Sequence, residues 1–355
     1  MTQLARLGWG PFFEDQSAVR ERGRALVCRV VEQQRGLYSV SGDFDGAAEI
    51  SGRFRHDAAT PADLPAVGDW VLVAVEDPSS RAVIHARLER RSVISRKAAG
   101  RAAEEQIIAA NIDTLFLVTA FAGDLNPRRL ERYLISVWDA GAAPVVVVNK
   151  SDLAEDAEAA AQDLRDRLSF VDVVAVSAAL DSGLAPLEPY LTAHTTVALV
   201  GSSGVGKSTI INQLAGHRRQ RVATVSDADG RGRHTTTARQ LIELPGGALL
   251  IDTPGMRELQ PWSGEAAVDG AFDDVAEAAR GCRFADCSHT TEPDCGVLAR
   301  VADGTIGADR LEHYRKMVRE LAFEERKRDK AASANVKRRW KQIHKALRNS
   351  PKLRS

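Results

Sequence analysis

Short, partly alternating apolar segments occupy the first quarter of the chain, from about residue 23 to residue 94. Four of them, RALVCRVVEQ, GLYSVSG, AEISGRFR and GDWVLVAV, have the length of strands, and turn residues separate them. A fifth segment, SVISR, closes the series. Several short strands joined by glycine-containing turns are typical of a small barrel. The pattern therefore predicts a small β domain, with an OB-like β-barrel as one candidate among other small β folds.

The pattern changes after RKAAGRAAEEQ, a polar stretch at residues 96–106 that we interpret as a linker. Largely apolar runs follow, namely NIDTLFLVTAF, APVVVVNKSD, VDVVAVSA, TTVALVGSS and ALLIDTPGM, and predicted helices such as NPRRLERYLISVWDAG lie between most of them. Strands that are buried on both faces have such continuous apolar runs. The alternation predicts one parallel sheet, covered by helices, over about residues 111–258.

One loop in this region has the sequence of a phosphate-binding motif. GSSGVGKS, at residues 201–208, follows a predicted strand and opens a predicted helix. In the motif G-x4-G-K-[ST], backbone N–H groups surround the phosphates and the helix N-terminus favours their charge. We expect Lys207 to contact the β- and γ-phosphates and Ser208 to bind Mg²⁺. The predicted phosphate-binding residues are Gly201, Ser202, Ser203, Gly204, Val205, Gly206, Lys207, Ser208 and Thr209.

Three further motifs complete the nucleotide site, and two of them indicate that the nucleotide carries guanine. In LLIDTPG, Asp252 can hold the Mg²⁺ shell and the N–H of Gly255 can contact the γ-phosphate. In NKSD, the Asp152 carboxylate can accept hydrogen bonds from N1 and N2 of guanine, a pair of donors that adenine lacks. In VSAA, the Ala178 N–H can donate to guanine O6. The predicted base-binding residues are Asn149, Lys150, Ser151, Asp152, Ser177 and Ala178.

The order of these motifs is reversed relative to familiar GTPases, because NKSD precedes the phosphate loop. Ligands of an open parallel sheet bind beyond the carboxyl ends of its strands, whatever order the chain visits them. Domain termini often lie close together at the surface, so joining them and opening the chain elsewhere preserves such a site. The motifs therefore predict one circularly permuted P-loop GTPase domain. A P-loop kinase is disfavoured because it has no need of NKSD.

A cysteine cluster follows the predicted GTPase domain. Cys282, Cys287, His289 and Cys295 have the spacing C-x4-C-x-H-x5-C. Three thiolates and one imidazole match a closed tetrahedral zinc site, with no position open for catalysis. We therefore expect one structural Zn²⁺ per chain, the alternative being free cysteines near a surface histidine. The remaining cysteine, Cys28, is expected to be a small buried residue.

Composition and charge suggest the setting and a partner. The chain has 355 residues, of which 44% are hydrophobic, which is enough for two or three domains with cores of their own. It has no run of 18 apolar residues and no N-terminus of the signal-peptide type, so we expect a cytoplasmic protein without a membrane partner. Lys plus Arg and Asp plus Glu both total 48, but residues 326–355 hold twelve Lys and Arg and one acid. This tail suggests a polyanionic partner, and its Trp340 is expected either to stack on a base or to pack against its own helix.

The combination of motifs resembles one known family. NKSD, VSA, GSSGVGKST, RGRHTTT and DTPG in this order, with a β-barrel before and C-x4-C-x-H-x5-C after, are similar to the ribosome small-subunit-dependent GTPase A family of bacteria. The resemblance covers nearly the whole chain. It implies an OB-fold, a permuted GTPase domain and a zinc domain that act in late maturation of the small (30S) ribosomal subunit, with contacts to its rRNA.

Hydrolysis needs a group that orients the attacking water. Ras-type enzymes have Gln after the Gly of DTPG, but Met256 stands there in this chain and a thioether cannot replace the amide. The nearest candidate is His234 in RGRHTTT, with Thr236 as the favoured Mg²⁺ ligand beside it. Alternatively, His234 only caps its loop. If docking on the small subunit orders this polar segment, turnover of GTP to GDP should be slow alone and faster on the subunit.

We therefore expect a monomeric, multidomain α/β protein. Residues 1–95 are predicted to form an N-terminal extension plus the OB-like barrel, residues 96–270 the permuted GTPase domain with its parallel sheet, and residues 271–355 a helical zinc-binding domain with the basic tail. Two other functions stay open at this point. One is a GTP-regulated RNA-binding module in which hydrolysis is incidental, and the other is a permuted GTPase acting on the large subunit, another ribonucleoprotein or a metabolic target.

Overall fold

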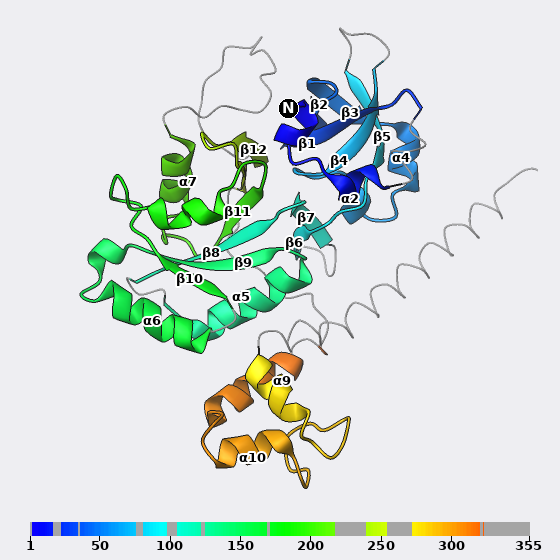
Figure 1. The fold of residues 1–355 in the computed structure, drawn as a ribbon. Coiled ribbons are helices and arrows are strands. Elements are labelled where there is room, and N and C mark those ends of the chain that lie inside the picture. Colours follow the sequence, from blue (N-terminus) through cyan, green and yellow to red (C-terminus); the bar gives the residue numbers. More distant parts are fainter. Residues whose placement is uncertain are drawn as a thin grey trace, which may run out of the picture. The chain divides into compact units, whose positions relative to one another are not determined.

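The computed structural model describes residues 2–16, 23–34, 36–75, 81–97, 105–121, 125–168, 171–216, 239–253, 272–319 and 322. The described residues belong to two compact units, one up to Thr253 and one from Phe272 onwards (Figure 1). The first unit contains a barrel and an open sheet, and the second contains the cysteine cluster. The predicted boundary after residue 270 lies outside the described residues, and that after residue 95 stays a prediction.

Five strands close a barrel in the first unit. β1 pairs with β2 on one side and with β4 on the other, and β5 joins β3 to β4. A short helix, α4 (Gly52–Asp57), lies between β3 and β4 in the chain. This closed five-stranded arrangement confirms the predicted OB-like barrel. The barrel strands are β1 (Leu26–Gln34), β2 (Leu37–Gly42), β3 (Gly46–Ile50), β4 (Trp70–Ala74) and β5 (Ala82–Arg87).

The segment AEISGRFR is only partly a strand. β3 ends at Ile50, and α4 begins two residues later because the Ser51 hydroxyl accepts a hydrogen bond from the Phe54 N–H at 3.1 Å. A serine at the N-cap satisfies a backbone donor that a helix leaves unpaired, so the chain changes from strand to helix at this residue. The prediction of a single strand over the whole segment was wrong.

The segment SVISR does not close the barrel. It forms β6 (Val93–Lys97), which pairs with β7 (Glu105–Ala110) in a separate two-stranded sheet. The barrel is closed by β5 instead, a strand that the pattern did not predict. The ends of the predicted linker at residues 96–106 are therefore parts of strands. Alternation shows that a segment can be a strand, but the partner is decided by packing in three dimensions.

The second part of this unit is the predicted open sheet. Its strand order is β10-β9-β8-β11-β13-β12, parallel except for β12, which runs antiparallel to β13. The unpredicted strand is β12. The strands are β8 (Thr114–Ala120), β9 (Ala143–Asn149), β10 (Asp172–Ala175), β11 (Thr196–Val200), β12 (Arg239–Glu243) and β13 (Leu249–Asp252).

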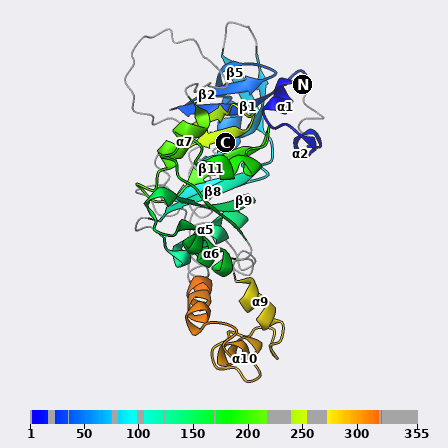
Figure 2. The same ribbon diagram turned by 60° about the vertical axis from the view of Figure 1, so that its left-hand side comes forward.

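Helices cover both faces of this sheet. Along β8, Leu115 and Leu117 belong to one core with residues of α5 (Pro127–Asp139) and α6 (Ala157–Arg167), whereas Phe116 and Val118 belong to a second core with residues of α7 (Lys207–Ala215). Figure 2 shows α5 and α6 on one side of the strands and α7 on the other. Burial of both faces explains the continuous apolar runs in the sequence.

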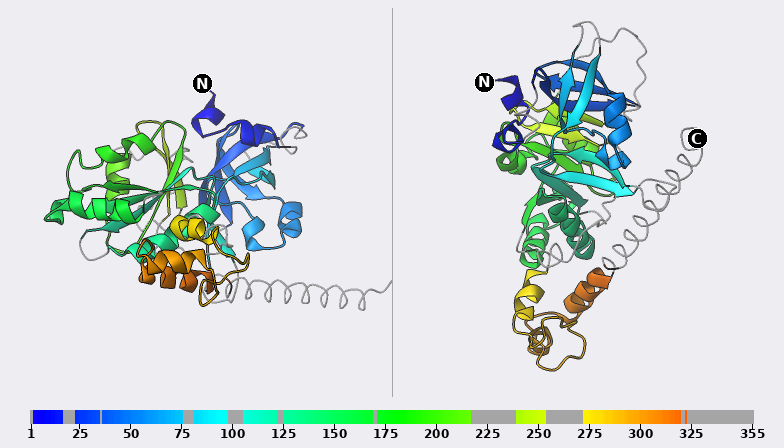
Figure 3. Two further views of the ribbon diagram at one scale, coloured as in Figure 1. Left: turned by 60° about the horizontal axis from the view of Figure 1, so that its bottom comes forward. Right: turned by 90° about the vertical axis from the view of Figure 1, so that its right-hand side faces the viewer.

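The barrel and the open sheet are joined through their backbones. Glu32 and Gln33 of β1 pair with Gln240 and Arg239 of β12, so the strands of both parts form one 11-stranded sheet. Two further views show the blue barrel strands beside the green strands of the open sheet (Figure 3). β12 is therefore the strand through which the GTPase part contacts the barrel by backbone pairing.

Arg29 of β1 reinforces this junction from inside. Its side chain is only 1% exposed, and its guanidinium donates to the carbonyls of Leu7, Gly68 and Asn111 and to the Thr196 hydroxyl, at 2.6 to 3.1 Å. Burial lowers the pKa of Arg29 to about 10, so it stays protonated at neutral pH. One cation thus holds the N-terminal extension, the barrel and the open sheet together.

We expect Arg29→Met to destabilise the first unit by about 3 kcal/mol, because it leaves several buried acceptors without a donor. This change in the free energy of unfolding is measured by urea unfolding, followed with a spectroscopic signal that comes from the first unit. Arg24→Met, on an exposed residue of the same segment, is the matched control and should stay within about 0.5 kcal/mol of wild type. Equal midpoints for both variants would show that the Arg29 contacts do not matter for folding.

The second unit is helical in its described part. α9 (Asp273–Ala279) and α10 (Gly296–Ala302) flank the cysteine cluster, and residues 308–319 form a further helix. Arg310 on this last helix makes a bidentate ion pair with Asp274 of α9, with N–O distances of 2.5 and 2.8 Å. Among the described residues of both units, no helix is long and apolar enough to cross a membrane.

Candidate functional site

The phosphate-binding motif connects β11 to α7 (Lys207–Ala215), as predicted. The Lys207 ammonium donates to the Gly201 and Ser202 carbonyls at 2.6 and 2.7 Å, which curls the side chain back over its own loop. The phosphate loop and the first turn of α7 therefore lie at the carboxyl end of β11. The exposed residues of the motif are Ser203, Gly204, Ser208 and Thr209.

Two glycines of the loop are required by its shape. Gly201 has φ +150°, and a Cβ there would overlap the Val118 carbonyl oxygen of the neighbouring strand. Gly206 has φ +99°, and a Cβ there would overlap the Asn149 amide. Both positions thus combine a backbone conformation that favours glycine with a close approach of another segment. The motif fits against β8 and the NKSD segment only because side chains are absent at Gly201 and Gly206, respectively.

Asn149 connects three predicted motifs. It is buried at the end of β9, its Nδ2 donates to the Val205 carbonyl of the phosphate loop at 2.8 Å, and its Oδ1 accepts from the Ala178 N–H at 3.0 Å. The sequence predicted that the Ala178 N–H donates to guanine O6 and missed this internal partner. A buried asparagine at a strand end is the signal that could have revealed it, because a buried amide needs partners.

The base-recognising carboxylate is held by a neighbouring hydroxyl. Ser177, which is buried, donates a hydrogen bond to one carboxylate oxygen of Asp152, which is exposed. Lys150 has φ +64°, and the Ser151 N–H donates to the Val176 carbonyl at 3.0 Å. The turn after β9 is therefore bonded to the end of β10, and this places NKSD and VSA together at one edge of the sheet.

The predicted Mg²⁺ ligands are only partly described. Asp252 ends β13, which runs parallel to β11, so its carboxylate comes to the same sheet edge as Ser208 at the start of α7. The third predicted Mg²⁺ ligand, Thr236, lies outside the described residues, as do Gly255, the predicted γ-phosphate contact, and His234, the predicted water-positioning residue; their roles remain predictions.

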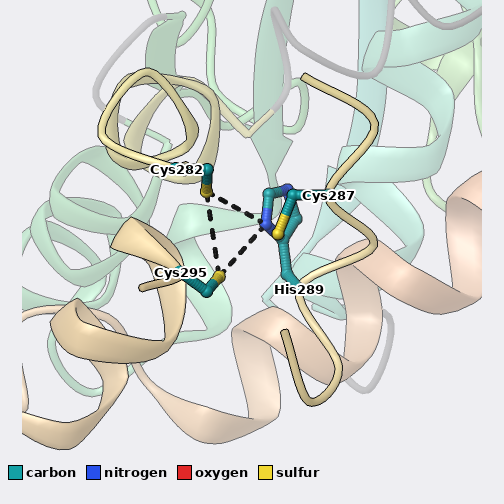
Figure 4. A group of neighbouring side chains, drawn as sticks. All are labelled: Cys282, Cys287, His289 and Cys295. Carbon is teal, nitrogen blue, oxygen red and sulfur yellow. Dashed lines mark hydrogen bonds between the residues drawn. The ribbon is translucent and has the colours of Figure 1, made fainter. Parts of the chain in front are cut away.

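The four predicted metal ligands lie together in the second unit (Figure 4). The ligand atoms of Cys282, Cys287, His289 and Cys295 are all within 4.8 Å of one another. The Cys282 and Cys295 sulfurs are 3.8 Å apart, and His289 Nδ1 lies 3.6 and 3.4 Å from them. Zinc bonds of about 2.3 Å to sulfur and about 2.0 Å to nitrogen, in tetrahedral geometry, give separations of about 3.8 and about 3.5 Å. The donor set and its spacing fit a tetrahedral metal ion.

Electrostatics favour the metal-binding forms of two of these ligands. Burial raises the pKa of the Cys282 thiol, but the Val297 and Gly296 N–H groups and the neighbouring thiols stabilise the thiolate, and the pKa falls below its usual value. Burial lowers the pKa of His289, which favours the neutral imidazole. Thiolate and neutral imidazole are the forms that bind metal ions.

Residues outside the motif hold the metal-binding loop. The Glu292 carboxylate accepts hydrogen bonds from the Ser288 and Thr290 N–H groups at 2.9 and 2.7 Å, and the Ser288 hydroxyl with these N–H groups keeps the pKa of Glu292 well below its usual range. Arg315, from the helix over residues 308–319, donates to the His289 carbonyl. Neither contact was predicted from the sequence, because Glu292 stands at a variable position of the motif and Arg315 lies outside it.

The fold and these sites define a circularly permuted P-loop GTPase with an N-terminal barrel and a Cys3His cluster. A family model described as RsgA GTPase matches residues 87–262. A protein of Opitutus terrae described as small ribosomal subunit biogenesis GTPase RsgA is 45% identical, over 97% of each chain. A Methanosarcina acetivorans protein of the same description is 45% identical over 79% of this chain and 76% of its own. The chain belongs to the RsgA GTPase family, and GTP hydrolysis is the activity that this family implies.

Solved structures agree with this assignment. YjeQ from Thermotoga maritima is 26% identical, with a TM-score of 0.63, over 84% of this chain and 99% of that one. YloQ, described as a circularly permuted GTPase, is 26% identical with a TM-score of 0.59, over 85% of this chain and 96% of that one. The permutation inferred from the motif order is confirmed.

Proposed function

We propose that this chain binds GTP at the sheet edge formed by β9, β10, β11 and β13 and hydrolyses it to assist late maturation of the small ribosomal subunit. The single observation that carries the proposal is the Asn149 amide, which joins the phosphate loop to the base-binding motifs with bonds of 2.8 and 3.0 Å. The names of the relatives from Opitutus terrae and Methanosarcina acetivorans support the small subunit as the target.

Each residue of the site has a part in this reaction. Backbone N–H groups of residues 201–208 and the Lys207 ammonium hold the phosphates, and Asp152 and Ala178 recognise the guanine. Ser208, Asp252 and Thr236 would hold Mg²⁺, which, when bound, neutralises charge on the β- and γ-phosphates. His234 would orient the water whose oxygen attacks the γ-phosphorus while the bond to the β–γ bridging oxygen breaks. Gly255 would donate its N–H to the γ-phosphate.

The metal at the Cys3His cluster is proposed to be zinc, one ion per chain. The protein supplies all four ligands of a tetrahedral ion. The ion would therefore fix the loop and leave no coordination position for a substrate. In the second unit the ion would join the loop that precedes α10 to the end of α9. The basic tail at residues 326–355 lies outside the described residues, and a contact of this tail with rRNA phosphates stays a proposal.

The experiment that tests the function is GTP turnover with and without purified subunits. We expect slow turnover by the protein alone and an increase of at least tenfold with small subunits, because ordering a catalytic loop is a positioning effect. Large subunits are the control. Equal stimulation by both would favour a different ribonucleoprotein target, and no stimulation by either would favour an RNA-binding module in which hydrolysis is incidental.

The same experiment tests the proposed water-positioning residue through the variant His234→Ala. It should bind GTP and small subunits like wild type and lose the stimulated part of the rate. His56→Ala, on an exposed residue of α4, is the matched control. If His234→Ala is stimulated as strongly as wild type, His234 does not position the water and the subunit supplies that group.

A further inference from the structure

Gln213 joins the phosphate-binding helix to the base-binding loop. It lies on α7, the helix that begins with Lys207 of the phosphate loop. Its Nε2 donates to the carbonyls of Leu180 and Asp181, at 2.7 and 3.1 Å. These carbonyls belong to the loop after β10, the loop that starts with the VSA motif. No sequence motif assigns a role to this glutamine.

The loop that Gln213 holds is a closed unit. The Ser177 N–H donates to the Gly183 carbonyl, the Leu180 N–H to the Ser177 carbonyl and the Gly183 N–H to the Leu180 carbonyl, at 3.1 to 3.2 Å. A Cβ at Gly183 would overlap the Ser177 carbonyl oxygen, so the turn is also tightly packed. Because the loop is bonded to itself, a displacement of the Leu180 carbonyl displaces Ala178 as well.

The outer end of this loop, residues 179–182, is exposed. The Leu180 side chain is 55% exposed, so its apolar packing fixes the position only weakly. Further along the chain, buried Leu184 and Leu187 share a core with Ile210 of α7 and anchor the segment that follows the loop. The loop is thus held at one end by the bond between Ala178 and Asn149 and at the other end by the packing of Leu184 and Leu187. The two hydrogen bonds from Gln213 hold the exposed part between these ends.

The geometry requires a donor at this position. Two carbonyl oxygens face the Gln213 amide, and only its N–H2 end can bond to them. Its other end, Oε1, is buried without a hydrogen-bond partner in the described part of the chain. A buried acceptor without a partner costs free energy, so the amide keeps this orientation because the two bonds of its Nε2 offset that cost.

We propose that Gln213 is a positioning residue for guanine recognition. It holds the loop of residues 177–183 so that the Ala178 N–H, which donates to Asn149 Oδ1, can be shared with guanine O6, and it does so from the helix that carries the phosphate site. The base-binding loop and the phosphate-binding helix are thus tied to each other by hydrogen bonds. This inference rests on the proposed GTP site.

The test uses Gln213→Glu, which keeps the shape of the side chain and replaces the donor with an acceptor. Dissociation constants are measured for GTP, for 6-thio-GTP and for inosine triphosphate. The sulfur of 6-thio-GTP is a weak acceptor, so the ratio of its dissociation constant to that of GTP reports the Ala178 contact. Inosine triphosphate lacks the 2-amino group, so its ratio to GTP reports the Asp152 contact.

We expect Gln213→Glu to weaken GTP binding about tenfold and to remove most of the preference over 6-thio-GTP, while the preference over inosine triphosphate persists. Gln213→Met, which removes the donor without adding charge, should shift the same ratio in the same direction. Gln162→Glu, on an exposed glutamine of α6 that bonds to Asp166, is the matched control and should behave like wild type.

Three results would overturn the proposal, and they are distinguishable. If both Gln213 variants bind GTP and keep the wild-type preference over 6-thio-GTP, Gln213 does not position the loop, although the GTP site stands. If wild type itself does not prefer GTP over inosine triphosphate, the guanine site is wrong and the role of Gln213 falls with it. A merely structural role would lower all three affinities by the same factor and leave both ratios unchanged.

Discussion

Asp152→Asn is expected to change the nucleotide that this protein binds. The substitution replaces a carboxylate that accepts from guanine N1 and N2 with an amide that presents a donor to one of them. Loss of these charge-assisted hydrogen bonds should cost about 3 kcal/mol, which weakens GTP binding by roughly two orders of magnitude. Xanthosine triphosphate carries a carbonyl oxygen in place of the 2-amino group, so its affinity should rise.

The structure shows why the asparagine should face the base in a defined way. Ser177 donates to one carboxylate oxygen of Asp152. An asparagine can keep its oxygen on this hydroxyl, and its N–H2 group then takes the place of the other carboxylate oxygen. The new donor is thereby aimed at the base. The same serine that positions the carboxylate for guanine would position the amide for xanthine.

Competition binding with GTP, xanthosine triphosphate and ATP measures this switch. Asp156→Asn is the matched control, because Asp156 is an exposed N-cap of α6 and asparagine caps a helix equally well. The control should keep the wild-type order of affinities. An Asp152→Asn protein that binds GTP as tightly as wild type would refute the assignment of this carboxylate to guanine.

Cys295→Ser should remove the metal ion and unfold the second unit. Cys295 is buried, and its sulfur is both a predicted metal ligand and the N-cap of α10, where it accepts from the Leu298 N–H at 3.4 Å. Serine is a good N-cap but a poor zinc ligand, so the variant keeps the cap and loses the ligand. A structural zinc site in a small domain contributes on the order of 10 kcal/mol to folding, more than the second unit can lose and remain folded.

Elemental analysis and limited proteolysis measure this effect. Wild type should contain one zinc per chain, and Cys295→Ser less than half of that, with rapid cleavage in the second unit. GTP binding should persist, because the nucleotide-binding residues belong to the first unit. Cys28→Ser, in the barrel core, is the control and should keep the zinc. Wild-type protein without stoichiometric zinc, or a Cys295→Ser protein that keeps it, contradicts the site.

The chemistry of both sites could be predicted from the sequence because it is concentrated in short motifs. NKSD, GSSGVGKS and the Cys3His spacing each place their donors within a few residues of one another, so local geometry fixes what they can bind. The parallel sheet was predictable for a related reason. Strands that are buried on both faces need apolar side chains at every position, and this leaves continuous apolar runs in the chain.

Tertiary structure decided which segments meet. The closing strand of the barrel is β5 and not SVISR, and β12 joins the GTPase part to β1, because strand partners are chosen by packing between segments distant in sequence. The Arg29 guanidinium bonds to Leu7, Gly68, Asn111 and Thr196, and the Gln213 amide bonds to Leu180 and Asp181. A lone arginine or glutamine has no sequence pattern that names its acceptors. Residues close together in the sequence therefore determined which ligands the sites can bind. Contacts between residues distant in the sequence determined how the segments that carry these sites are positioned.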